Sequence, residues 1–112
     1  MRRPAIALLC VCALLSTVPG GALGAGAAAK PVTHRVVIDG LKYEPEALTV
    51  KRGDAIVWTN KDPFPHTVTA PGKFDSHDIA AGASWKYVAR RAGQYDYICT
   101  LHPNMKGTLR VE

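Results

Sequence analysis

Three side chains that bind soft metal ions follow one another at intervals of three near the carboxyl end of this 112-residue chain. They are a thiol, an imidazole and a thioether, provided by Cys99, His102 and Met105. A thiolate, two imidazoles and a weakly bound thioether form the donor set that selects copper for electron transfer. The spacing therefore predicts most of a copper site, and the second histidine must come from elsewhere in the chain.

His66 is the candidate for that second imidazole, because it opens a β-prone segment directly after a loop that contains two prolines. Strand-like alternation leads into Cys99 through Tyr95–Ile98 and resumes at Thr108–Val111. Both candidate regions therefore lie where strands end or on a short loop between them. We expect the two regions to meet at one end of a sheet.

Other metal centres fit these donors less well. Zinc prefers thiolates, imidazoles and carboxylates and gains little from a thioether. Covalently attached haem needs a Cys-x-x-Cys-His motif, which the sequence lacks. A binuclear copper centre or a structural disulfide needs a second cysteine near Cys99, and the other two cysteines, Cys10 and Cys12, lie far away in an apolar amino-terminal run. Each donor alone is more typical of a core or structural residue, so the indication comes from the four together.

The elements that position these donors are short and β-like, with turns marked by glycine and proline. The segments that we expect to form strands are 32–39, 48–50, 55–59, 66–70, 83–89, 93–99 and 105–111. Residues 41–46 and 74–79 are expected to be irregular connections. Seven or eight short strands without a helical period predict an all-β sandwich.

Residues 1–29 have the features of a secretory signal peptide. Arg2 and Arg3 precede an apolar run, Ile6–Val18, that is too short to span a bilayer comfortably. Helix-breaking and small residues follow, and cleavage is expected between positions 24 and 29, with the exact bond left open. An uncleaved membrane anchor is the alternative. We expect export to the periplasm and no membrane span after cleavage.

Removal of this segment leaves one domain, residues 30–112, with a single cysteine and no disulfide available. The net charge falls from +5 to +3, because two arginines are lost. This mild basicity does not indicate nucleic-acid binding. A domain of this size buries only about 60–65% of its chain surface, so a bound metal would add usefully to its stability.

These motifs resemble those of the cupredoxins, small blue-copper proteins such as amicyanin, pseudoazurin and plastocyanin. The resemblance covers about Val32–Glu112. It rests on the Cys-x-x-His-x-x-Met spacing, on Trp58–Asn60 and on the Pro-His-Thr sequence at His66. It implies a cupredoxin-like Greek-key β-sandwich of seven to eight strands that holds one type 1 copper ion per chain.

The resemblance also implies roles for individual residues. His66, Cys99, His102 and Met105 are the implied copper ligands. Asn60 is implied to join the His66 loop to the Cys99 loop by hydrogen bonds, and a simple turn-forming asparagine is the alternative. The sequence departs from amicyanin at one position, where a leucine replaces the usual proline between Cys and His. The amide of this Leu101 would lower the reduction potential if it pointed at the Cys99 sulfur.

The surface around His102 is the expected route for electrons. In cupredoxins one ligand imidazole reaches the surface within an apolar patch, here supplied by Phe64, Leu101 and Pro103. The expected partners are redox proteins, a c-type cytochrome or a periplasmic dehydrogenase or reductase, and the chain is expected to be a monomer. Three lysines could surround the patch: Lys61, Lys73 and Lys106. His34 and His77 are expected to be structural or surface residues.

Two other functions remain as alternatives to electron transfer. A copper carrier or buffer would deliver metal without redox shuttling, but such proteins tend to expose tracts rich in Met and His. Only two methionines occur here, and one is Met1. A copper oxidase or nitrite reductase would need further histidine clusters and a second copper domain, for which 112 residues leave no room. We therefore expect a carrier and not an enzyme.

Overall fold

The computed structural model describes residues 30–112. The expected signal peptide lies outside the described residues. Within residues 30–112 no helix is long and apolar enough to cross a membrane.

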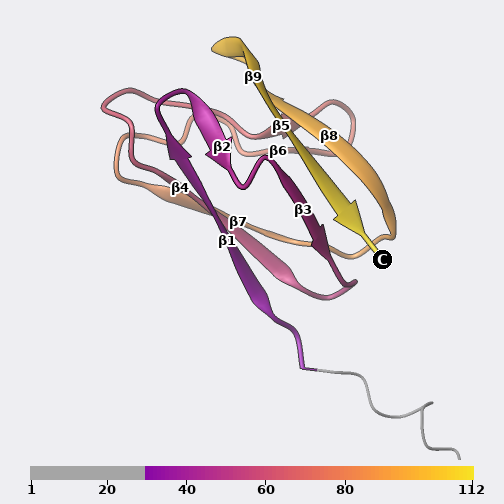
Figure 1. The fold of residues 1–112 in the computed structure, drawn as a ribbon. Coiled ribbons are helices and arrows are strands. Elements are labelled where there is room, and N and C mark those ends of the chain that lie inside the picture. The colour runs from indigo at the N-terminus through magenta and orange to yellow at the C-terminus, as the bar shows by residue number, and fades with distance from the viewer. Residues whose placement is uncertain (1–29) are drawn as a thin grey trace, which may run out of the picture.

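The described chain forms nine strands in two sheets that pack face to face (Figure 1). One sheet contains, in spatial order, β2 (Lys42–Glu44), β1 (Thr33–Asp39), β4 (Ala55–Asn60) and β7 (Ser84–Val88). The other contains β3 (Ala47–Val50), β9 (His102–Val111), β8 (Gly93–Cys99), β5 (Thr69–Ala70) and β6 (Phe74–Asp75). The predicted all-β sandwich is confirmed.

Alternating burial along the strands shows how the sequence builds the core. Val36 and Ile38 on β1 are buried while their neighbours are more exposed, as expected for strands with one face toward the core. Trp58 on β4 is fully buried, and its indole nitrogen donates a hydrogen bond to the Tyr97 hydroxyl on β8. This bond of 3.3 Å joins the two sheets at the centre of the core.

The strands differ from the sequence-based expectation in several places. There are nine instead of seven or eight, because short strands form in both segments that were expected to be irregular, and one of them is β6 within residues 74–79. The segment 41–46, expected to be irregular, contains β2 and the start of the connection to β3. The segment 66–70 forms a strand only at Thr69–Ala70, because His66 makes an isolated bridge to Ile79 instead. The last strand begins at His102 and not at Met105.

Proline at position 103 did not prevent the early start of β9. The strand pairs with β3 only at residues 108–111, so one edge of β9 is unpaired near Pro103. A proline is tolerated at such an edge because its missing N–H is not needed for a ladder bond. As a result, β8 and β9 form one long antiparallel hairpin whose turn lies between Cys99 and His102.

The two sheets bring the candidate ligands to one end of the sandwich. β1 and β4 run parallel in register from Thr33 opposite Ala55 to Ile38 opposite Asn60, so β4 ends at Asn60. The chain then passes through the loop that leads to His66. β8 ends at the same end of the molecule with Cys99.

Candidate metal centre

A tight hairpin turn positions two of the candidate donors. Cys99 and His102 are paired across the β8–β9 hairpin, with only Thr100 and Leu101 between them. The pairing register shifts at Ile98/Cys99, as in a β-bulge. Such irregularities redirect side chains locally, and here they lie directly beside the cysteine.

Backbone hydrogen bonds to a neighbouring segment hold His66. Its N–H donates to the Ile79 carbonyl at 3.2 Å, and the Ile79 N–H donates back at 2.7 Å. The side chain of His66 is fully buried, so it is surrounded by protein atoms and has no contact with solvent. The backbone of His66 is therefore fixed within the fold, and burial restricts the imidazole.

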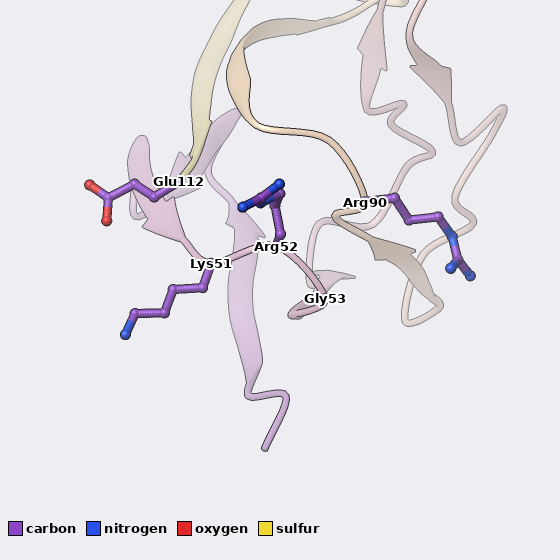
Figure 2. A pocket seen from close by; sticks show the side chains of 5 residues that line it. All are labelled: Lys51, Arg52, Gly53, Arg90 and Glu112. Atoms are coloured by element: carbon purple, nitrogen blue, oxygen red, sulfur yellow. The ribbon is translucent and has the colours of Figure 1, made fainter. Parts of the chain in front are cut away.

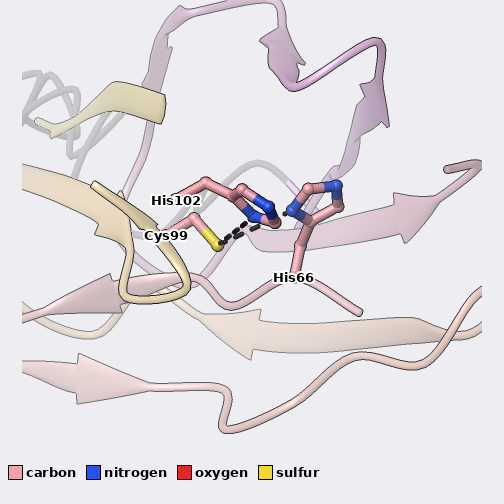
Figure 3. A group of neighbouring side chains, drawn as sticks. All are labelled: His66, Cys99 and His102. Atoms are coloured by element: carbon pink, nitrogen blue, oxygen red, sulfur yellow. Dashed lines mark hydrogen bonds between the residues drawn. The ribbon is translucent and has the colours of Figure 1, made fainter. Parts of the chain in front are cut away.

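His66, Cys99 and His102 come together in space, with their nearest ligand atoms all within 4.8 Å of one another (Figure 3). The Cys99 sulfur lies 3.6 Å from Nδ1 of His66 and 3.8 Å from Nδ1 of His102. Cys99 and His66 are buried, and His102 is half-buried. The predicted triad is thus assembled from segments 33 residues apart, with both Nδ1 atoms turned toward the thiol.

A buried carboxylate determines which nitrogen of His66 is available. Nε2 of His66 lies 2.7 Å from Oδ2 of Asp62, and only 6% of Asp62 is exposed. A carboxylate beside one ring nitrogen keeps the proton there, which leaves the other nitrogen free for a metal. The pair therefore directs Nδ1 of His66 toward Cys99.

Asp62 is itself anchored by the β1–β2 hairpin. Its two carboxylate oxygens accept hydrogen bonds from the backbone N–H groups of Gly40, at 2.8 Å, and Leu41, at 3.0 Å. Both residues have positive φ angles, 60° and 62°, as a type I′ hairpin turn requires. Burial acts to raise the pKa of Asp62, but the Leu41 and Gly40 donors and His66 outweigh it and lower the pKa. The side chain is therefore an anion.

Thr67 connects the segment after His66 to the cysteine. Its backbone N–H donates to the Cys99 sulfur at 3.3 Å, and its hydroxyl accepts a bond of 2.9 Å from the Thr100 N–H. The Thr67 carbonyl accepts a hydrogen bond of 2.6 Å from the Tyr43 hydroxyl. Burial raises the pKa of Tyr43 strongly, so this phenol remains a neutral donor. Thr67 is thus fixed from both sides.

This arrangement differs from two expectations. The amide that bonds the Cys99 sulfur belongs to Thr67, and the Leu101 N–H makes no hydrogen bond to that sulfur in the described structure. Asn60 donates to the Phe64 and Ile79 carbonyls, both at 2.9 Å, and so braces the loop before His66. The direct bonds to the Cys99 loop come from Thr67, which no sequence pattern singled out.

Met105, the fourth expected ligand, lies on β9 three residues after His102 and is 3% exposed. The two remaining described histidines lie outside the cluster. Nε2 of His34 lies 2.9 Å from the Asp54 carboxylate. His77 is exposed on the connection after β6, with a positive φ of 54°. Both are structural or surface residues, as expected.

An apolar surface covers the metal centre on its exposed side. Phe64 is 39% exposed and Leu101 47% exposed, and the Phe64 ring centroid lies 5.6 Å from that of His102. Leu41 at the tip of the β1–β2 hairpin, 45% exposed, is a further apolar residue near this end, since it lines a pocket with Asn104 and Met105. No motif in the sequence pointed to Leu41.

The donor set fits copper better than other metals. A buried thiol between two imidazole Nδ1 atoms, with a nearby thioether in the sequence, is the His₂Cys set of blue-copper sites. No carboxylate belongs to the described cluster, because the carboxylate of Asp62 bonds the far side of His66. Zinc and hard cations would favour carboxylate or further thiolate ligands in this position.

Comparison with known proteins agrees with the geometry. The model of the cupredoxin-like domain family matches residues 5–111. The chain belongs to this family. Amicyanin-alpha of Methylorubrum extorquens is 34% identical over 98 residues, which cover 82% of each protein.

Two solved structures illustrate the range of proteins that share this cupredoxin fold. A methionine-to-alanine mutant of amicyanin in its Cu(I) form has a TM-score of 0.66 and 32% identity, and the match covers 79% of this chain and 88% of that one. A Cu-containing nitrite reductase from Thermus scotoductus has a TM-score of 0.67 and 27% identity. That match covers 78% of this cupredoxin but only 24% of the reductase chain.

Proposed function

We propose that this cupredoxin is an exported type 1 copper protein that carries single electrons between redox partners. The observation that carries the proposal is the buried cluster in which two Nδ1 atoms and one thiol lie within 4.8 Å of one another. His66, Cys99 and His102 would hold one copper ion, with Met105 as the weak fourth ligand. Copper would supply a reversible one-electron change between Cu(II) and Cu(I).

The chain contributes rigidity to this chemistry. Asp62 keeps the proton on Nε2 of His66, and the Thr67 amide donates to the Cys99 sulfur. Both interactions hold the ligand residues from outside the donor set, so the ligand atoms would need little rearrangement when the oxidation state changes. A hydrogen bond to the sulfur also tunes the redox potential of such sites.

The half-buried His102 is the proposed exit for electrons. Its ring lies beside Phe64 within the apolar surface, and such exposed apolar patches usually mark contact sites. A redox protein, such as a c-type cytochrome or a periplasmic dehydrogenase or reductase, would dock here. We propose that the carrier is a periplasmic monomer and has no catalytic activity of its own.

Burial of the cluster favours electron transfer over a role as a copper carrier or buffer. A protein that delivers metal must release it readily, which requires accessible ligands. Here both Cys99 and His66 are fully buried, so copper could leave only after the loops open. A buried site therefore favours electron exchange with metal retained.

Voltammetry and metal competition together test the proposal. We expect one reversible one-electron wave in voltammetry. We also expect that a competing chelator removes no copper on the time scale of electron exchange. Replacing Leu101 with glutamate should slow electron transfer to a redox partner, because it places a charge within the apolar surface. The same substitution at the exposed Val32, far from the cluster, should not. Rapid copper release, or an irreversible wave, would contradict the proposal.

A further inference from the structure

Positive charge collects at the end of the sandwich opposite the metal centre. β8 runs from Gly93 to Cys99, and β9 returns from His102 to Val111, opposite Gly93. Six residue steps in an antiparallel strand span about 20 Å, which separates the two ends. Six exposed cations lie around the far end or along the edge leading to it: Lys51, Arg52, Lys73, Lys86, Arg90 and Arg91.

Four of these cations line a groove of about 520 Å³, which we call the basic groove. Its cations are Lys73, Lys86, Arg90 and Arg91, and the remaining lining residues are Gly72, Tyr87, Val88 and Tyr95. The expectation that Lys73 surrounds the apolar surface at His102 was therefore wrong. Within the described part of the chain, no carboxylate lines the groove. Every ion pair within residues 30–112 joins an aspartate to a histidine. None of the lysines and arginines of the groove therefore pairs with a carboxylate of the described chain.

The positive surface continues from the groove to a neighbouring pocket. Arg90 lines both, and the second pocket is completed by the Lys51–Gly53 turn and by Glu112. Figure 2 shows the Arg90 side chain extending away from Lys51 and Arg52, so the cations spread over this end instead of gathering at one point. Among the described residues that line the two pockets, Glu112 is the single carboxylate side chain.

Backbone contacts fix the position of the two adjacent arginines. The Tyr95 hydroxyl donates a hydrogen bond of 2.8 Å to the Arg91 carbonyl, which ties the β7–β8 connection to β8. The N–H of Gly53 donates to the carbonyl of Ala89 at 2.6 Å, directly before Arg90. The backbone that carries Arg90 and Arg91 is therefore held in place by the fold. Binding of a partner would not require this connection to become ordered first.

Composition favours a protein as the occupant of the groove. Arginine and tyrosine are enriched at the centres of protein interfaces, and both residue types line the groove. Small-molecule sites are instead mostly apolar and enclosed, unlike this exposed basic surface. A second copy of the same chain is a poor occupant, because the described residues carry a net charge of +3 from twelve basic and nine acidic side chains.

We propose that the basic groove docks an acidic polypeptide segment of a partner protein, separately from the apolar surface around His102. Glutamate or aspartate side chains would pair with Lys86, Arg90 and Arg91, while the aromatic rings pack against the partner's backbone. A partner bound here leaves the His102 surface free. This proposal concerns binding alone and does not depend on electron transfer.

The test is a titration of the full chain, in its diamagnetic Cu(I) form, with a short poly-glutamate peptide followed by NMR. We expect amide shifts at residues of the basic groove and none at residues 101–104, with binding that weakens as salt is added. The double variant Arg90→Glu/Arg91→Glu should bind at least about tenfold more weakly, since each charge reversal turns an attraction into a repulsion. The matched control, Lys61→Glu/Lys106→Glu, makes the same change in net charge near the metal centre and should bind as the wild type does.

Other results would overturn the proposal. Equal weakening in the control variant would show that only net charge matters. Shifts centred on residues 101–104 would assign the acidic segment to the apolar surface. Equally tight binding to inorganic phosphate would indicate a free-anion site, and stronger binding to vesicles containing anionic lipid would indicate a membrane surface. Absence of poly-glutamate binding at low salt would also refute it.

Discussion

Replacing Asp62 with asparagine removes one acceptor from a buried carboxylate that is surrounded by donors. The carboxylate receives hydrogen bonds from Gly40 N–H on Oδ1, and from Leu41 N–H and the His66 ring on Oδ2. An asparagine of the same shape has one oxygen and one NH₂ group. If the NH₂ group takes the place of Oδ1 it faces one donor, and if it takes the place of Oδ2 it faces two.

The expected cost follows from this count. At least one N–H group loses its acceptor in either orientation, and a buried unsatisfied polar group costs about 1–3 kcal/mol. We therefore expect the free energy of unfolding of the metal-free Asp62→Asn protein to fall by about that amount. For a domain of this size each kcal/mol lowers the melting temperature by roughly 4–8 °C.

Copper binding should change in the same variant. A carboxylate that orients a ligand histidine typically contributes about 10–100-fold to metal affinity, so a loss of that order is expected. Neutralising a negative charge beside His66 also disfavours the more positive Cu(II) state. The reduction potential should therefore rise.

Denaturant unfolding of the metal-free protein and competitive copper titration measure the two effects. Asp39→Asn is the matched control, because Asp39 is an exposed aspartate at the end of β1 and loses the same charge. The control should leave both quantities within experimental error. An Asp62→Asn protein as stable as the wild type, with unchanged copper affinity, would refute the role given to this carboxylate.

Two further predictions concern Thr67 and Asp54. Thr67→Ala removes the acceptor of the Thr100 N–H and should lower the free energy of unfolding by about 1–3 kcal/mol. Thr67→Ser keeps the hydroxyl and should retain most of the wild-type stability. Equal losses of stability in the two variants would show that the hydroxyl is not the cause. Hydrogen bonds from the Val32 N–H, the His34 ring and the Lys51 N–H lower the pKa of Asp54 from 3.8 to about 2. Because the folded-state pKa is depressed, its contribution is complete above about pH 4 and is lost as the pH falls toward 2. The free energy of unfolding of the Asp54→Asn variant should therefore change less with pH between about 4 and 2 than that of the wild type. The same pH dependence in both proteins would contradict this role of Asp54.

Local spacing predicted the parts of the site that depend on a few neighbouring residues. Cys99 and His102 are separated by two residues, which is enough to place both in one hairpin. His66 was predicted from its β-prone context and resemblance, and the structure places it beside them from 33 residues away. The sandwich itself followed from the many short alternating segments.

The supporting residues could not be predicted because their roles depend on distant contacts. Asp62 contacts Gly40 and Leu41 only after the β1–β2 hairpin folds over the loop, and these two residues lie 22 and 21 positions earlier in the chain. Thr67 is an ordinary strand residue by sequence, yet its amide meets the sulfur of Cys99, which lies 32 residues later in the chain at the end of β8. The sequence suggested the Leu101 amide as the donor to the Cys99 sulfur. This donor could not be identified correctly, because no local sequence pattern reports the direction of an N–H group.

The absorption spectrum of the chain during titration with Cu(II) tests the central claim most directly. A thiolate bound to copper gives an intense visible charge-transfer band, and Cys99 is the one cysteine of the described residues. We predict that the band reaches its maximum at one copper per chain and is absent from a folded Cys99→Ser variant. A band that persists in Cys99→Ser, or a wild-type protein that binds copper without the band, would contradict the type 1 site.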